Sequence, residues 1–475
     1  MSKSPKIIFL AVSGFVALLI FIAVALVVFV DANAYKPRLE ATASAALGRE
    51  VRIDGRLGTG FFPGLLLTLR DVHILNRGED IVTTREARIA VDLLSLLRKE
   101  LHVRNIALKQ PVISIVRDSD GTFNFENPDG AEGASPALDL AKLSLSDASV
   151  LYADKQSGEG FEVGDCSLVL LRLHLSSGQG RDLMKNLSFT GTLACGELRA
   201  KRFAASDLKV AAGGRDGVFD LKPVTMDVFA TQGSGNIRAD FSGEAPVYSV
   251  RYALPEFQIR EAFKTLSPQQ SAEGTMDFSA TLSMRGKTVH GIKRTLRGQI
   301  SLRGENLTLI GTDLDKAFSR FESSQNFNLV DLAAFFYAGP FGLVVTKGYN
   351  FASIFQGAEG SSRIRRLVSD WKVEHGQAQA QDVAMVTDEN RIALQGRLNF
   401  VNETFDDVIV ALIDAQGCAT VQQEMHGTFH KPVVEKPNIL QSLSGPALKL
   451  LKKGRNVLTG AECDVFYTGS VAPPK

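Results

Sequence analysis

The sequence predicts a mainly β protein, built as a long antiparallel sheet with a few short helices and preceded by one N-terminal transmembrane helix. Three observations carry this prediction. An apolar stretch without charged residues runs from Ile7 to Val30. After Gly48 the dominant hydrophobic period becomes two, which is typical of strands that are buried on one face. Many of these stretches are bounded by Gly, Asp-Gly or Asn, the residues that hairpin turns need.

The amino-terminal stretch, residues 7–30, is long enough to span a membrane. As a helix it would extend about 36 Å at ~1.5 Å per residue, against a hydrocarbon layer of ~30 Å. Lys3 and Lys6 precede it, so residues 1–6 are expected in the cytoplasm and the later residues outside it. Ala32-Asn33-Ala34 leaves a cleaved signal peptide as the alternative, although the apolar part of such a signal has roughly 7–15 residues. Export is expected in both cases.

Behind the anchor, Pro37 to Leu47 reads as a short helix that ends at Gly48. The strongest strand pattern runs from Gly274 to Gly286, where Met276, Phe278, Ala280, Leu282 and Met284 alternate with polar residues. Such alternation predicts an antiparallel strand with one apolar face. Further strands are expected at Leu187–Leu193, Gly217–Ala230, Asn236–Phe241, Gly298–Leu302 and Gly396–Phe400. Short helices are expected at 93–99 and near 312–337, and residues 127–136 form a loop.

A sheet of this length must bury its apolar face, as a barrel, a sandwich or an open trough. An outer-membrane barrel fits poorly, because its precursor would carry a cleavable signal and no retained anchor. The alternation itself does not decide between a sandwich and a trough.

Composition and motifs argue against nucleic-acid binding and against an enzyme. The 53 basic and 52 acidic side chains balance, whereas nucleic-acid binders show a basic excess. No nucleophile motif, phosphate loop or metal-type cysteine pair is present, so neither a cofactor nor a metal is expected. His426 and His430 would lie about 13 Å apart on a strand, too far for one zinc ion. Asp118 to Asn124 reads as a hairpin turn rather than a calcium loop.

The four cysteines are Cys166, Cys195, Cys418 and Cys463, and in an oxidising compartment they allow three pairings. A Cys418–Cys463 disulfide is the favoured one, because both residues belong to the closing segment. Free buried thiols are the alternative, and the sequence does not pair Cys166 with Cys195. Pro446 to Lys453 reads as a short basic helix, which either contacts anionic headgroups or caps the last sheet edge.

Several segments resemble the AsmA family. The stretch Asp31–Gly55 is similar to the start of that family, with the helix ending in Leu47-Gly48-Arg49 and the strand Val51-x-Ile53-x-Gly55. Leu67–Asn76 and Val103–Asp118 continue the resemblance. At the far end, Gly469-Ser-Val471 is similar to the closing segment of the family.

The resemblance implies a protein of the bacterial inner membrane, anchored by a single span, with its main body in the periplasm. That body would be a curled sheet forming an open trough, similar to the trough of chorein-type bridge proteins. The parts would be 31–126 as the first part of the trough, 127–136 as a loop, 137–430 as the body of the trough, and 431–475 as a helical and closing segment.

The function implied is non-enzymatic transport of phospholipid toward the outer membrane. Its partners would be phospholipid, the inner membrane and, as further candidates, the outer membrane or other envelope proteins. The alternative is a structural or regulatory scaffold for outer-membrane assembly that carries no lipid. The side chains expected to line the trough are Leu193, Met276, Phe278, Leu282, Met284, Ile300 and Leu302.

Overall fold

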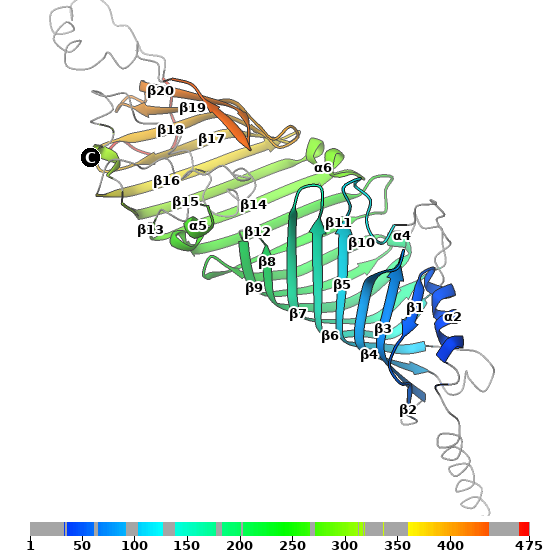
Figure 1. Ribbon diagram of the computed structural model, residues 1–475. Helices are drawn as coiled ribbons and strands as arrows, with labels where there is room; N and C mark the ends of the chain where they lie inside the picture. Colours follow the sequence, from blue (N-terminus) through cyan, green and yellow to red (C-terminus); the bar gives the residue numbers. More distant parts are fainter. Residues whose placement is uncertain are drawn as a thin grey trace, which may run out of the picture. The chain divides into compact units, whose positions relative to one another are not determined.

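The computed structural model describes residues 33, 36–60, 65–91, 103–126, 138–176, 183–200, 203–266, 271–311, 313–316, 318, 336, 360–436 and 465–474. The chain divides into two compact units, Met1–Ala200 and Lys201–Lys475, called unit 1 and unit 2 below. Both units are mainly β, with few helices (Figure 1). No described helix is long and apolar enough to cross a membrane, and the predicted span 7–30 lies outside the described residues.

In unit 1, strands follow one short helix. The elements are α2 (Lys36–Leu47), β1 (Glu50–Ile53), β2 (Gly58–Gly60), β3 (Leu65–Asn76), β4 (Glu79–Val91), β5 (Val103–Arg117), β6 (Leu138–Asp154), β7 (Glu159–Leu175), α4 (Leu183–Asn186) and β8 (Leu187–Ala200). Helix α2 confirms the helix predicted at 37–47. The strands β3 to β8 pair in chain order, and β1 and β2 both pair with β3.

In unit 2, strands also dominate. The elements are β9 (Phe203–Arg215), β10 (Val218–Val228), β11 (Thr231–Asp240), β12 (Val247–Gln258), α5 (Ile259–Leu266), β13 (Ser271–Glu273), β14 (Thr275–Arg285), α6 (Val289–Thr295), β15 (Arg297–Ile310), β16 (Ser361–Glu374), β17 (Gln377–Val386), β18 (Arg391–Asn399), β19 (Thr404–Ile413), β20 (Ala419–Thr428) and β21 (Lys431–Val434). The predicted strand at 274–286 is β14, which pairs with β12 and β15.

The expectation of an antiparallel sheet holds for the described pairs of unit 2 and fails at one pair in unit 1. Strands β5 and β6 run parallel, with Leu108 opposite Leu145. The chain therefore returns to the same end of the sheet between Arg117 and Leu138, as a parallel pair requires. This connection contains the loop predicted at 127–136, which lies outside the described residues. Of the helices predicted near 312–337, residues 314–316, Phe318 and Phe336 are described and helical.

Strand bulges in unit 1 keep apolar residues on one face. Asp71, Gln110, Asp147 and Asp165 adopt positive φ angles of 51–52° in β3, β5, β6 and β7. Each falls where the cross-strand pairing is interrupted, and at Asp147 and Asp165 the register also shifts by one residue, as between Leu145 and Ala148. Simple alternation would send two apolar residues that are three apart to opposite faces. The extra residue returns them to the same face and bends the strand there.

The densest core lies in β16 to β20 of unit 2. In β18 the consecutive residues Ile392, Ala393 and Leu394 are at most 2% exposed, so both faces of the strand are covered. On one face the segment 465–471 packs, with Tyr467 and Val471 in the same buried cluster as Ala393. This segment contains the predicted closing motif Gly469-Ser-Val471.

Candidate functional site

Unit 1 presents a continuous apolar surface across six neighbouring strands, called the apolar face of unit 1 below. Cross-strand pairing aligns one row of side chains on β3 to β8: Leu69, Ala87, Leu108, Leu145, Leu168 and Leu193. A second row contains Ile74, Val82, Ile113, Val150, Val163 and Leu198. Most of these side chains are only half-buried, which is the condition of a face that is open to an apolar ligand.

Between the two rows lies a buried central row at the level of the bulges. It consists of Val72, Thr84, Pro111, Ala148, Cys166 and Cys195, all buried. Cys166 on β7 and Cys195 on β8 form a disulfide across the strands. Because the central row is buried while its neighbours stay half-exposed, the face curls around this row. The sequence showed the four cysteines but did not pair these two.

Helix α2 covers the first strands of this face. Its Leu39 and Ala43 pack against a buried cluster that includes Val51, Val72 and Ala87. The apolar residues four apart on a short helix explain this docking, since they share one helix face. The strands farther along, β6 to β8, have no comparable helix packed on them among the described residues.

The predicted lining residues fall into two groups. Leu193 in unit 1 and Leu282 and Met284 in unit 2 are half-buried. The other four are buried, with exposed fractions of 1% for Met276, 8% for Phe278, 6% for Ile300 and 0% for Leu302. All four are on the predicted apolar face of β14 and β15. Whether any of the seven contacts lipid stays a prediction.

The chain at Phe336 contacts this face of unit 2 and explains why these four side chains are buried. Leu302 is paired with Ser369 of β16, so the two side chains share a face. The Ser369 hydroxyl donates a hydrogen bond of 2.8 Å to the carbonyl of Phe336, and it accepts one of 2.7 Å from Trp371 Nε1. The Phe336 side chain is fully buried. The chain at Phe336 therefore covers the apolar face of unit 2 at this point.

Tyr252 marks the boundary between the covered and the half-exposed parts of that face. It pairs with Ala280 on β14 and packs over glycines of β11, where a Cβ at Gly233 would lie 2.0 Å from its hydroxyl. Among the described residues its buried hydroxyl has no hydrogen-bond partner. Burial, helped by the charge of Asp227, raises the pKa of Tyr252 to about 12, so the phenol stays neutral.

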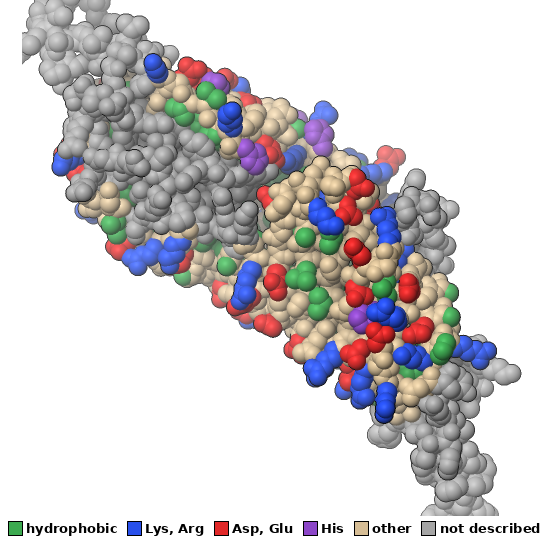
Figure 2. All heavy atoms as spheres, in the orientation of Figure 1, with side chains coloured by type: hydrophobic (Ala, Val, Ile, Leu, Met, Phe, Trp, Pro, Cys, Tyr) green, Lys and Arg blue, Asp and Glu red, His purple; other side chains and the backbone are tan. Residues whose placement is uncertain are grey.

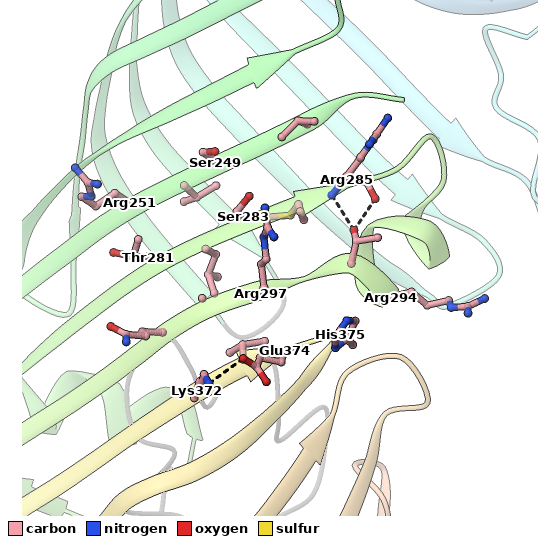
Figure 3. Close-up of a pocket in the computed structure, with 18 of the residues that line it drawn as sticks. Ser249, Arg251, Thr281, Ser283, Arg285, Arg294, Arg297, Lys372, Glu374 and His375 are labelled. Carbon is pink, nitrogen blue, oxygen red and sulfur yellow. Dashed lines mark hydrogen bonds and ion pairs between the residues drawn. The ribbon is translucent and has the colours of Figure 1, made fainter. Parts of the chain in front are cut away.

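A pocket of about 1030 Å³ opens in unit 2 along β12, β14, β15 and β16, next to α6. Figure 3 shows its serine, threonine and basic side chains on neighbouring strands. Two cross-strand rungs supply most of them. One rung joins Arg251, Thr281, Gln299 and Lys372, and the other joins Ser249, Ser283 and Arg297.

The α6 end of the pocket carries two further arginines, Arg285 and Arg294. The Thr295 hydroxyl accepts a hydrogen bond of 2.7 Å from the Arg285 backbone N–H and donates one to the Arg285 carbonyl. These bonds fix the end of α6 to β14. Val247 lies on the same face as the basic and hydroxyl groups, whereas Val250, Leu282, Met284 and Val373, which also border the pocket, belong to the opposite side of their strands. Among the described residues that line the pocket, Glu374 is the one carboxylate, and the hydrogen bond from Lys372 lowers its pKa. No local sequence pattern marks this pocket, because strand pairing brings its basic residues together from separate strands.

Other residues that could have carried chemistry lie apart. His426 on β20 contacts Glu435, whereas His430 contacts Glu403. The predicted turn at Asp118–Asn124 contains a hydrogen bond from the Gly121 N–H to the Asp118 carbonyl. Within the described part of the chain no group of His, Cys, Asp or Glu could hold a metal ion. Cys418 is disulfide-bonded, but Cys463 lies outside the described residues, so their pairing stays a prediction. The predicted basic helix Pro446–Lys453 also lies outside them.

Comparison with known proteins identifies the family. A search of curated proteins finds no match to this chain. A family model described as AsmA family matches residues 1–170 and 179–336. These two stretches contain α2, the whole apolar face of unit 1 except part of the β7 end, and the strands β9 to β15. The match covers more than half of the sequence, and the chain therefore belongs to the AsmA family.

Proposed function

We propose that this protein binds phospholipid acyl chains on its curled apolar faces and moves phospholipid between the membranes of the bacterial envelope. Membership of the AsmA family is consistent with a lipid-related role in the envelope. The observation that carries the proposal is the apolar face of unit 1. Most side chains of its aligned rows stay half-exposed over six strands.

The dimensions and energetics fit an acyl chain. Five steps between neighbouring strands at ~4.8 Å give a row of about 24 Å, and an acyl chain occupies about half of a ~30 Å hydrocarbon layer. Exposing such a chain to water costs about 0.8 kcal/mol per methylene. A continuous apolar surface removes most of this cost without any chemical step, so the function needs no catalytic residue and no cofactor. The direction of transport would have to come from partners or from the membranes themselves.

The proposal includes the site of action. Residues 7–30 would anchor the chain in the inner membrane with its amino end in the cytoplasm, as the flanking Lys3 and Lys6 favour. The two units would then lie in the periplasm, where an oxidising environment maintains disulfides such as Cys166–Cys195. Transport toward the outer membrane would support its biogenesis, with other envelope proteins as candidate partners.

A scaffold without lipid is the second candidate, and one observation favours it. Phe278, Ile300 and Leu302 were expected to line a trough, yet they are at most 8% exposed. Where the face is filled by protein side chains, it stabilises the fold and offers no room for an acyl chain. If unit 1 were closed in the same way by a partner protein, the chain would hold envelope machinery together.

Site-specific photocrosslinking in living cells tests the two candidates. Leu168 and Ser167 are neighbours on β7, but Leu168 is half-buried on the apolar face and Ser167 is exposed on the other. A photoreactive residue at position 168 should capture phospholipid, and the same residue at 167 should capture little. Leu282 and Ser279 provide the equivalent pair on β14 of unit 2.

The two candidates give different products. Phospholipid adducts at 168 and 282 but not at 167 and 279 support transport. Protein adducts alone at 168, without lipid, support the scaffold. Equal lipid capture on both faces contradicts a binding face of any kind.

A further inference from the structure

We propose that the pocket beside α6 is a binding site for a phosphate-bearing anion, formed by Arg251, Arg285, Arg294 and Arg297. This goes beyond lipid transport on the apolar faces. Thr281, Ser283 and Arg297 belong to the opposite side of their strands from Leu282 and Gly298, since neighbouring residues on a strand point to opposite faces. The proposal therefore does not depend on the proposed function.

These four arginines are unpartnered within the described part of the chain. Among the described residues, the side chains of Arg251, Arg285, Arg294 and Arg297 make no hydrogen bond or ion pair. Four arginines on neighbouring strands behave differently. Arg238 pairs with Asp220, Arg303 with Asp370, Arg365 with Asp388 and Arg397 with Asp407.

The contrast holds within one strand. Arg297 and Arg303 are both on β15 and on the same face, yet only Arg303 pairs with an acid, at 2.7 Å from Asp370. On the face drawn in Figure 2, basic and acidic side chains also lie side by side over much of the described surface. Interspersed signs are what a solvated surface normally has. The pocket instead gathers basic groups around one acid, Glu374, which is already bound to Lys372 at 2.8 Å.

Arginine side chains from separate strands of the pocket can reach one common anion. Arg251 and Arg297 are separated by two strands and one rung, which is about 12 Å between Cα atoms at ~4.8 Å per strand and ~6.6 Å per rung. Two extended arginine side chains can close this distance onto a single group. In Figure 3, Arg297 stands beside Ser283, between the arginine of β12 and the arginines at the α6 end. The pocket is therefore surrounded by positive charge on several sides.

The side chains of the pocket favour a phosphate group as the anion. The planar guanidinium group binds phosphate oxygens in pairs, so a cluster of arginines favours phosphate over a monodentate anion. Ser249, Ser283 and Thr281 add hydroxyl donors for the remaining oxygens or for a polyol. A volume of about 1030 Å³ exceeds the need of inorganic phosphate. It suits a phosphate ester that carries a glycerol or sugar, either soluble or as the headgroup of a lipid.

Calorimetric titration of the full chain, purified in a maltoside detergent at low ionic strength, tests the proposal with two probes. Glycerol 3-phosphate represents a soluble ester, and dihexanoyl phosphatidylglycerol represents a lipid headgroup. The wild-type protein should bind at least one probe, and added salt should weaken that binding. The double variant Arg251→Gln/Arg297→Gln should weaken it about tenfold or more, because each charge-assisted contact is worth at least that factor.

The matched control is Arg303→Gln, which removes a paired arginine from the same face of β15 and should leave binding unchanged. Circular dichroism should show that all variants stay folded. Weakening of both probes supports a phosphate site shared by both sources, and weakening of one alone identifies the source. Absence of binding to the wild-type protein, an unchanged double variant, or an equal loss in Arg303→Gln overturns the proposal. Lipid capture at position 168 is unaffected by any of these outcomes.

Discussion

The apolar face of unit 1 and the strands β16 to β20 of unit 2 contain similar runs of apolar residues but differ in their degree of burial. In β18, Ile392, Ala393 and Leu394 are buried on both faces. In β7, Leu168, Val169 and Leu170 all remain half-buried. The difference teaches that an apolar run predicts a strand but does not decide whether protein or another molecule covers it.

The covering segments explain the contrast. Strand β18 is covered on one face by the segment with Tyr467 and Val471. In unit 1, α2 packs at Val51 and Ala87 near the first strands, while β6 to β8 have no such cover among the described residues. The strands around β18 thus form a core, and the apolar face of unit 1 is a surface available to a ligand.

The largest effect is expected for truncation of a leucine in the covered region. Leu398→Ala on β18 removes a side chain that is 0% exposed, and should lower the free energy of unfolding by about 2–5 kcal/mol, since a cavity remains. Leu145→Ala on β6 removes a half-buried side chain and should cost only about 1 kcal/mol. Backbone hydrogen exchange at increasing urea concentration measures the free energy of unfolding of each unit in both variants.

Equal losses for the two leucines would contradict the comparison, because they would mean that the face of unit 1 is a closed core. The same measurement in the presence of phospholipid provides a second test. Ligand binding should stabilise unit 1 of the wild-type protein and stabilise it less in Leu145→Ala, since ligands stabilise the state that binds them.

The next largest effect concerns the disulfide on the curled face. Cys166 and Cys195 are 29 residues apart, and closing a loop of that size stabilises the fold by about 3–4 kcal/mol through chain entropy. Cys166→Ala/Cys195→Ala should lower the stability of unit 1 by this order and leave the hydrogen exchange of β18 unchanged. Unchanged stability of unit 1 in this double variant would show that the buried central row of its apolar face is stable without the disulfide.

The smallest effect is expected for the contact between segment 465–471 and Asp382 of β17. Asp382 accepts hydrogen bonds from the Ser470 N–H, at 3.0 Å, and from the Tyr467 hydroxyl. Burial of Asp382 disfavours its charge, but these hydrogen bonds outweigh burial and hold the pKa of Asp382 below its ordinary value. Asp382→Asn should therefore weaken docking by about 1–2 kcal/mol. Limited proteolysis near residue 470 measures the loss.

The pH dependence of docking follows from the same shift. A carboxylate with a lowered pKa stabilises the folded state fully above its ordinary pKa of 3.8, and that stabilisation is lost as the pH falls further through the folded value. Proteolysis by an acid-active protease should thus increase below about pH 3.8 in the wild-type protein, but not further in Asp382→Asn. The exposed pair of Asp388 with Arg365 supplies the control variant Asp388→Asn, which should dock normally.

The sequence by itself determined the class of fold and the elements with strong local signals. Alternation of apolar residues located β14, because side chains on a strand point to alternate faces whatever the strand contacts. Pro37 and Gly48 delimited α2 for an equally local reason. The segments around Asp31–Gly55 and Val103–Asp118 identified the family, which the family match confirmed.

Only the tertiary structure decided which apolar residues are available and which basic residues meet. Leu302 and Leu282 follow the same alternation, yet Leu302 is covered by the chain at Phe336 and Leu282 is not. The parallel pairing of β5 with β6 and the bulges at Asp147 and Asp165 set the alignment of the rows in unit 1. The arginine pocket depends on the register of four strands. Burial, register and coverage are relations between segments far apart in the chain, so no local pattern encodes them.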